Sequence, residues 1–223
     1  MAELAEPAVA HGPPPGAPMV PAFSIVPLAG IPIVAVALAG LVAAVESNSL
    51  WGLTFFHVVG GGLWTGVDLF VGFVVGPIIG RMSIPARIEF STRFMPKMLL
   101  LMPTLVTMTL ASGFQLARHV GNLQAGSPNH NWLVASYIVV GIMAVVAIGI
   151  LEPANLTVLF ELKKPRPDGQ LIARQMKRFV YTAGVTGAMQ VATLIIMTYL
   201  ASHLASGRCR PSRSSARARS GSR

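Results

Sequence analysis

Long apolar stretches alternate with short polar connections along most of the chain. A helix needs about 20 apolar residues to cross a hydrocarbon core about 30 Å thick. By this measure the pattern predicts five membrane-spanning helices. The first is expected to begin late because prolines crowd its start, and the fourth leaves open a helical continuation past Pro153. The predicted spans are Phe23–Val45, Leu50–Gly80, Met95–Ala117, Trp132–Leu151 and Phe179–His203.

The composition agrees with this pattern, since 53% of the residues are hydrophobic and only 11% are charged. A soluble domain normally carries about 25% charged residues. We therefore predict an all-α fold, a polytopic transmembrane helical bundle over residues 23–203, with the lipid bilayer as its surroundings. Residues 1–22, rich in proline and glycine, and residues 204–223, rich in arginine and serine, are predicted to be disordered.

Basic residues, which give the chain a net charge of +9, gather beside the predicted spans. Cytoplasmic loops of membrane proteins carry an excess of Lys and Arg. The connection between the second and third spans and that between the fourth and fifth are both basic. This places the N-terminus in the cytoplasm and the C-terminus outside. The basic residues of these two connections are Arg81, Arg87, Arg93, Lys97, Lys163, Lys164, Arg166, Arg174, Lys177 and Arg178.

The C-terminal tail disagrees with this orientation, because it holds six arginines and would lie outside. Either the tail is cytoplasmic and one span is miscounted, or the internal loops decide the orientation. Two internal loops agree, so we prefer the second alternative. No aromatic residues are interleaved with the basic blocks, so no nucleic-acid partner is expected. The single cysteine, Cys209, lies in the tail, which excludes a thiolate metal site within the spans.

The second span carries small and polar residues on one face. His57, Gly61, Trp64 and Asp68 follow at i, i+4, i+7 and i+11, which is one stripe along an α-helix. Glycines continue at four-residue spacing beyond Asp68. Small residues let a neighbouring helix approach closely. The glycines predicted to pack against another helix are Gly61, Gly72, Gly76 and Gly80.

Asp68 is the residue of this stripe that is hardest to explain by packing. An ionised carboxylate in a membrane costs several kcal/mol unless it is paired or faces water. His57 lies about 16 Å away along the same helix, too far to pair with it. The partner must come from another span, such as the polar third span or Gln190 in the fifth. We therefore predict that Asp68 is a catalytic group that accepts a proton or orients its site.

Four of the five histidines map to the outer side under this topology. Neutral imidazole is the commonest side-chain ligand of metals and of haem iron. His57, His119 and His203 are therefore predicted ligands. The alternative is that His57 forms a hydrogen bond within the bundle and that histidines are merely tolerated at span ends. Methionines in the spans, which also serve as core fillers, suit Cu(I); they are Met102, Met108, Met143, Met189 and Met197.

Two neighbouring segments, FFHVVGGGLWTGVDLFVGFVVGPIIGRM and RFMPKMLLLMPTLVTMTLASGFQL, carry a family resemblance. Together they resemble a bacterial membrane superfamily that includes the copper-resistance D proteins, the HemJ-type protoporphyrinogen oxidases and related predicted integral membrane proteins. The pattern is a span opening with His, six residues, Trp, one residue and Gly, then an Arg-rich loop, then a span that ends in a small residue and Gly. The matching residues, within about 52–117, are His57, Trp64, Gly66, Arg81, Arg93, Lys97, Ser112 and Gly113.

This resemblance implies a small helical bundle of the bacterial inner membrane that holds haem b or copper, and the predicted topology puts the histidines near its outer leaflet. The resemblance makes His57 a ligand and implies that Trp64 and Lys97 belong to the cofactor site. The chain departs from the HemJ pattern by reading VDLFVG where those proteins have LPRL after the tryptophan, and by an extra apolar span ahead of the motif.

Three functions are compatible with these features. The first is a membrane protein of redox or metal handling that binds haem b or copper. The second is a non-enzymatic accessory subunit of a respiratory or transport complex, or of a homo-oligomer, in which the glycine stripe is the docking face. The third is a small proton-coupled transporter in which Asp68 is the carrier. The sequence leaves open whether the protein is an enzyme.

Overall fold

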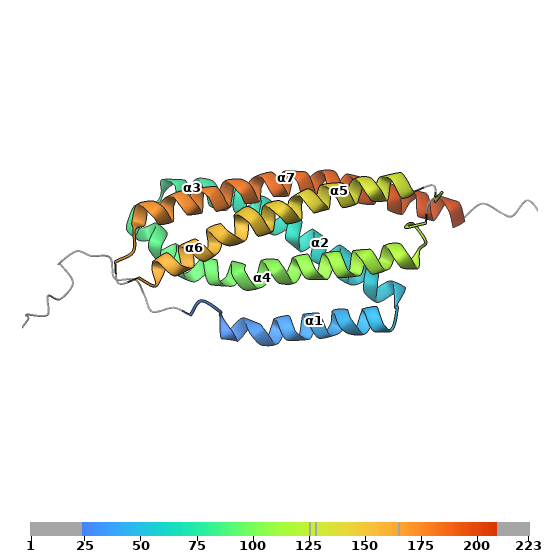
Figure 1. Ribbon diagram of the computed structural model, residues 1–223, viewed down its shortest axis with the longest axis horizontal. Coiled ribbons are helices and arrows are strands. Elements are labelled where there is room, and N and C mark those ends of the chain that lie inside the picture. Colours follow the sequence, from blue (N-terminus) through green and yellow to red (C-terminus); the bar gives the residue numbers. More distant parts are fainter. Residues whose placement is uncertain (1–23, 125, 128, 165, 209–223) are drawn as a thin grey trace, which may run out of the picture.

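The computed structural model describes residues 24–124, 126–127, 129–164 and 166–208, with residues 203–208 described by their backbone alone. Every regular element in this part of the chain is helical (Figure 1). The elements are η1 (Leu28–Gly30), α1 (Ile31–Glu46), α2 (Leu50–Phe70), η2 (Val71–Val75), α3 (Gly76–Arg81), α4 (Ile84–His119), α5 (His130–Val146), η3 (Ala147–Leu151), α6 (Glu152–Leu162) and α7 (Gly169–Arg208).

The prediction of an all-α bundle with five spans is confirmed, because five of these helical stretches are long and apolar enough to cross a membrane. The first begins late, at η1, as its prolines led us to expect, and the fourth continues past Pro153. The spans are Leu28–Glu46, Leu50–Arg81, Ile84–His119, His130–Leu162 and Gly169–Ser202.

Two helices extend beyond the predicted limits of their spans. Helix α4 begins at Ile84 instead of Met95, and α7 begins at Gly169 instead of Phe179. Half of the ten basic residues that the sequence places in the two basic connections lie in these helical extensions: Arg87, Arg93, Arg174, Lys177 and Arg178. The extensions stay helical because each keeps an apolar face, with Ile88 and Ile172 buried in the core. The charged side chains, such as that of Arg93, lie on the exposed face.

The predicted terminal segments fall mostly outside the described residues. Residues 1–22 lie there entirely, and so do residues 209–223 of the predicted tail. Helix α7 continues to Arg208, so the C-terminal helix ends later than the predicted boundary at His203.

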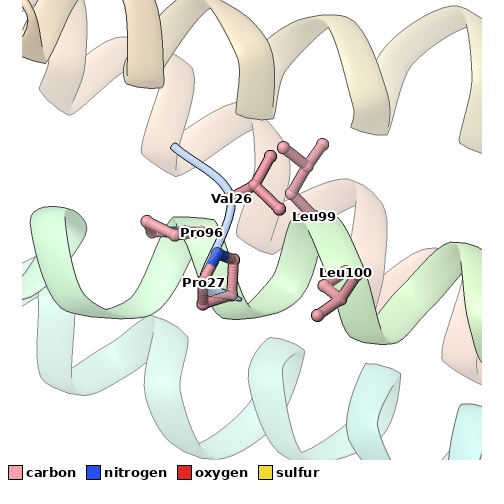
Figure 2. Close-up of a pocket in the computed structure, with 5 residues that line it drawn as sticks. All are labelled: Val26, Pro27, Pro96, Leu99 and Leu100. Atoms are coloured by element: carbon pink, nitrogen blue, oxygen red, sulfur yellow. The ribbon is translucent and has the colours of Figure 1, made fainter. Parts of the chain in front are cut away.

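Helices α2, α4 and α7, together with the α5–η3–α6 span, form the closed part of the bundle, and α1 packs on its outside against α4 and α2 (Figure 1). The chain just before α1 also lies on α4. There Val26 and Pro27 face Pro96, Leu99 and Leu100 across a small apolar hollow of about 70 Å³ (Figure 2). The hollow has only apolar side chains in its wall, so it is a packing feature that carries no chemistry.

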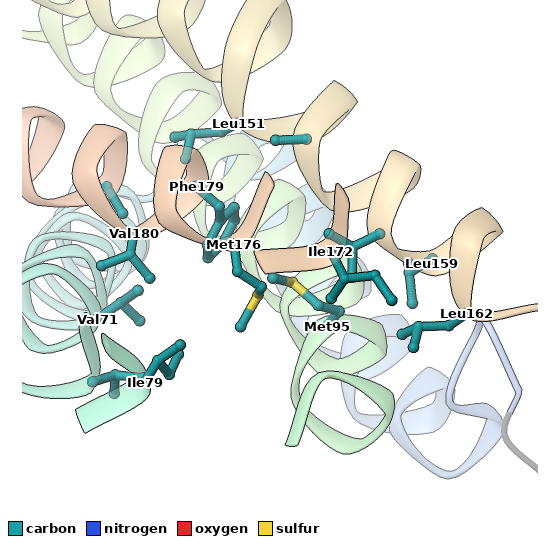
Figure 3. Close-up of a cluster of buried hydrophobic side chains, with 14 of the residues drawn as sticks. Val71, Ile79, Met95, Leu151, Leu159, Leu162, Ile172, Met176, Phe179 and Val180 are labelled. Carbon is teal, nitrogen blue, oxygen red and sulfur yellow. The ribbon is translucent and has the colours of Figure 1, made fainter. Parts of the chain in front are cut away.

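The main hydrophobic core lies at the basic end of the bundle. Met95 of α4 and Met176 of α7 are fully buried at its centre, and Leu159 of α6 and Val71 of η2 close it from two other sides (Figure 3). A second, smaller cluster formed by Trp64, Leu105 and Met143 lies further along the bundle. The polar site described below lies between these two apolar clusters.

The second and the fourth span are each interrupted by one π-helical segment, η2 in the second and η3 in the fourth. Each segment is followed within two residues by a proline, Pro77 or Pro153. Proline has no N–H group and its ring clashes with the carbonyl group one turn earlier. The helix therefore loses its regular hydrogen-bond register just before each proline, and a π turn, a feature frequent at functional sites, takes up the mismatch.

The glycine stripe contacts two different helices. A Cβ atom at Gly72 would lie 2.3 Å from the Cα atom of Gly184 in α7, and one at Gly76 would lie 2.3 Å from a Val180 methyl group. Gly61 faces Thr109 of α4, at an ordinary 3.4 Å. At Gly80 no described atom lies within 4 Å of such a Cβ, so the structure gives this glycine no packing role.

Candidate functional site

Asp68 is buried in the bundle, with 2% of its surface exposed. Its Oδ2 atom accepts hydrogen bonds from Gln190 Nε2 at 2.8 Å and from Thr186 Oγ1 at 3.4 Å. Both partners lie on α7, one helical turn apart, and therefore face α2 together. The prediction that Asp68 has its partner on another span is confirmed, and Gln190 is that partner.

Asp68 borders a cavity of about 240 Å³ between α2, α4, α7 and the α5–η3–α6 span. A second carboxyl group, that of Glu152 at the start of α6, lines the same cavity together with Asn155. Most of the remaining wall is apolar. The other lining residues are Trp64, Met98, Met102, Pro103, Val106, Thr107, Met143, Ala147, Ile148, Leu151, Phe179 and Thr186.

The local sequence explains why Glu152 reaches this place. It follows η3 directly and precedes Pro153, so it occupies the first turn of the helix that restarts after the π segment. Three residues of η3, including Leu151, line the cavity with it. Asn155 follows three residues later, which puts it on the same face of α6 as Glu152.

Two amide oxygens beside the carboxyl groups are buried and have no hydrogen-bond partner among the described residues. They are Oδ1 of Asn155 and Oε1 of Gln190, and each residue is only 2% exposed. A buried polar atom without a partner is unfavourable by about 1–3 kcal/mol. Both atoms can only accept a hydrogen bond. With the two carboxyl groups, Oδ1 of Asn155 makes the polar wall of the cavity rich in acceptors, whereas Gln190 is hydrogen-bonded to Asp68 but is not a lining residue.

The cavity opens on the outer surface of the bundle between α4 and the α5–η3 segment. Pro103 and Thr107 on α4 and Ile148 on η3 line it and are themselves exposed, Ile148 by 73%. Helix α4 packs closely on α6 but makes little contact with α5. In a membrane this opening faces the acyl chains.

The cavity lies in the half of the span nearest the basic end. At about 1.5 Å per residue, Asp68 is about 27 Å from Leu50 and about 20 Å from Arg81 along its helix. The lining residues Met98 and Phe179 come directly after Lys97 and Arg178, whose side chains are exposed. The two carboxyl groups therefore lie close to the height along the bundle at which the exposed Lys and Arg side chains of the basic end begin.

His57 and Asp68 share a helical stripe but not a site. His57 Nδ1 lies 3.0 Å from the backbone oxygen of Thr109, and its ring packs against Gly113, both on α4. Because a carbonyl oxygen only accepts, Nδ1 carries the proton of this hydrogen bond, and in the neutral ring Nε2 keeps its lone pair. Trp64 does line the cavity beside Asp68, whereas His57 is not among the lining residues.

The other predicted ligands are not brought together around His57. His119 is the exposed last residue of α4, Lys97 is exposed on the same helix, and the side chain of His203 lies outside the described residues. Within the described part of the chain, no three His, Cys, Asp or Glu side chains gather in a way that could hold a metal ion. The roles of these residues in binding haem or copper stay predictions.

Comparison with protein-family models found no match, and neither did searches of the curated proteins and of the solved structures. The resemblance to the copper-resistance D and HemJ-type proteins therefore stays a prediction.

Sequence reasoning assigned no role to Glu152, Asn155 or Thr186, which line this site. One signal was present for the first two. The pattern Glu-Pro-Ala-Asn directly continues an apolar run, and a helix that continues through it turns Glu152 and Asn155 to one face. Thr186 is one turn before Gln190, the polar residue already noted in the fifth span.

Proposed function

We propose that this protein is a small proton-coupled transporter of cations, with Asp68 and Glu152 as its proton- and cation-binding groups. The observation that carries the proposal is the acidic cavity inside the span, in which two carboxyl groups from different helices line one space. A membrane-buried acid is expensive to keep and marks an ion or proton path when it faces a cavity. The same cost argues against a purely structural role for the pair.

The residues around Asp68 suit a group that changes its protonation state. The Gln190 side-chain NH₂ group donates to the carboxylate, and its Oε1 atom has no partner among the described residues. When the Gln190 amide turns over, the same side chain accepts a hydrogen bond from a protonated Asp68. One residue thus serves both the charged and the neutral form. A proton and a cation then compete for the same carboxyl groups, which is the basis of exchange.

The proposal is tested with purified protein in vesicles that are acid inside and carry a pH-sensitive dye. Sodium, potassium, magnesium and a permanently charged organic cation, benzyltrimethylammonium, are added outside in turn. At least one cation is expected to raise the internal pH faster than in protein-free vesicles. If none of them does so, the proposed function is wrong.

We also propose that the protein lies in a bacterial cytoplasmic membrane with its N-terminus inside. The support is the charge asymmetry: Arg81, the first turns of α4, the α6–α7 connection and the first turns of α7 put most of the described Lys and Arg residues at one end of the bundle, whereas the other end has Arg118 and Arg208. A reporter inserted near Gly126 is expected to be outside, and one inserted near Asp168 inside. Protease protection or a pair of fusion enzymes measures this, and reversed signals would place the acidic cavity near the outer surface.

A second candidate function is suggested by His57, whose Nδ1–H hydrogen bond to Thr109 leaves Nε2 with a lone pair for haem iron or copper. If His57 is a ligand, the detergent-purified protein carries a Soret band or bound copper, and His57→Ala loses it. His119→Ala and His203→Ala then test which further histidine completes the coordination. A wild-type protein that retains neither haem nor copper after expression with both rules this function out.

A further inference from the structure

We infer that the cation bound in the acidic cavity is a small amphipathic organic ammonium ion that enters from the lipid side. This inference rests on the proposed function and names the class of its substrate. Four features of the cavity fit such an ion: the type of its polar atoms, its volume, its apolar wall and its opening.

The carboxyl and amide oxygens of the cavity are hydrogen-bond acceptors, so a ligand that fits them is a hydrogen-bond donor. Asp68 and Glu152 accept hydrogen bonds when ionised, and Oδ1 of Asn155 is buried with no partner in the described part of the chain. Asn155 is 98% removed from solvent and lines the cavity, so a ligand there can satisfy it. An ammonium group brings N–H donors and a positive charge to all three. An anion or a neutral acceptor would leave the Asn155 oxygen unsatisfied.

The volume is too large for a bare inorganic ion. At about 30 Å³ for each water molecule, 240 Å³ is the space of about eight waters. Most of the wall cannot hydrogen-bond to water, because it consists of apolar side chains such as Met143 and Phe179. An apolar group attached to the ammonium ion would fill this part and gain from leaving water. Trp64 adds an aromatic ring, which attracts a cation at its face.

The opening indicates the route. It lies between α4 and η3, where exposed Pro103 and Ile148 form its rim. A molecule with an apolar body partitions into the bilayer and reaches this opening without passing through the polar ends of the bundle. An inorganic ion has no comparable path through acyl chains, because a charged group in hydrocarbon is strongly unfavourable.

The test measures binding to the purified full-length protein in detergent, by calorimetry and by thermal stability. The probe is phenethylammonium, and the uncharged control ligand is 2-phenylethanol. We expect saturable binding of the ammonium ion and at least 10-fold weaker binding of the alcohol. Benzyltrimethylammonium, which has the charge but no N–H group, is expected to bind more weakly than phenethylammonium because it cannot donate to Asn155.

Variants assign the binding to this cavity. Asp68→Asn and Glu152→Gln are each expected to weaken phenethylammonium binding by about 10- to 100-fold, the loss of a charge-assisted hydrogen bond. Glu89→Gln is the matched control, because Glu89 is an exposed acid on α4 that pairs with Arg93. It should bind like the wild type. Because two cavity variants are measured, a folding defect in one of them does not by itself decide the result.

Two results would overturn the inference. The first is equal binding of phenethylammonium and 2-phenylethanol, or equal binding by the wild type and both cavity variants. The second is stabilisation by sodium or magnesium alone at the same carboxyl groups, which would assign the cavity to an inorganic ion. The second result leaves the proposed transport function standing. Absence of any cation-driven proton movement in vesicles would instead remove the transport function while leaving a measured ammonium site in place.

Discussion

Asp68→Asn is expected to abolish cation-driven proton movement while leaving a folded bundle. Asparagine has nearly the same shape as aspartate, and its side-chain oxygen can still accept the hydrogen bond that Gln190 Nε2 now gives to the carboxylate. It cannot bind or release a proton and carries no charge. The rate of internal pH change in the acid-loaded vesicles should therefore fall to the rate of protein-free vesicles. Exchange at the wild-type rate would show that the proton path does not use Asp68.

Asp68→Leu separates this functional role from a structural one. Leucine removes the acceptor altogether, so the buried Gln190 amide loses its partner, and its Oε1 atom already lacks one among the described residues. An unsatisfied buried group is unfavourable by about 1–3 kcal/mol. We expect Asp68→Leu to unfold at a lower temperature in detergent than Asp68→Asn. Equal stability of the two would mean that the Asp68–Gln190 hydrogen bond does not hold α2 and α7 together.

Gly72→Ala is expected to have the largest effect on stability of any glycine substitution in the second span. The added Cβ would lie 2.3 Å from the Cα atom and 2.8 Å from the nitrogen of Gly184. These are backbone atoms, so no side chain can move aside and the helices themselves must separate. Overpacking of this kind is unfavourable by about 1–3 kcal/mol or more. The separation would also draw Asp68 away from Thr186 and Gln190, since the same two helices carry them.

Two other glycines form a graded comparison for this experiment. A Cβ at Gly184 would lie 3.3 Å from the Cα atom of Gly72, so Gly184→Ala should have a smaller effect. At Gly62, no described atom lies within 4 Å of a Cβ, and alanine favours a helix over glycine by about 1 kcal/mol. Gly62→Ala should thus be neutral or stabilising. Thermal unfolding in detergent measures all three, and the packing argument fails if Gly72→Ala is as stable as Gly62→Ala.

The fold could be predicted from the sequence because each span is recognisable as a long run of apolar residues. The limits of the spans were harder to predict, since a basic side chain such as that of Arg93 marks the end of an apolar run without ending the helix. Helices α4 and α7 continue past this point because one face of each helix is buried in the core. That face is recognisable only when its partners, such as Met95 and Met176, are known to meet.

The site was predictable only in part. Asp68 stands out because it is an acid in a long apolar run, and Gln190 because it is an amide in another. Glu152 does not stand out in this way, because it lies beside a proline at the edge of its apolar run and resembles the start of a loop. Sharing a stripe on one helix also does not bring His57 and Asp68 to one site. At the level of His57 the helix faces α4 at Thr109, while at the level of Asp68 it faces α7.

The π turns next to the two carboxyl groups have a mechanical consequence. Each is a stretch in which the helix accommodates one residue more than its regular hydrogen-bond register allows. Such an excess can pass along a helix by exchanging one set of backbone bonds for the next, and every residue that it passes rotates by about 100° about the axis. Asp68 lies three residues before η2, and Glu152 lies directly after η3. A short migration of either excess residue would swing one carboxyl group out of the cavity while the ends of its span stay in place.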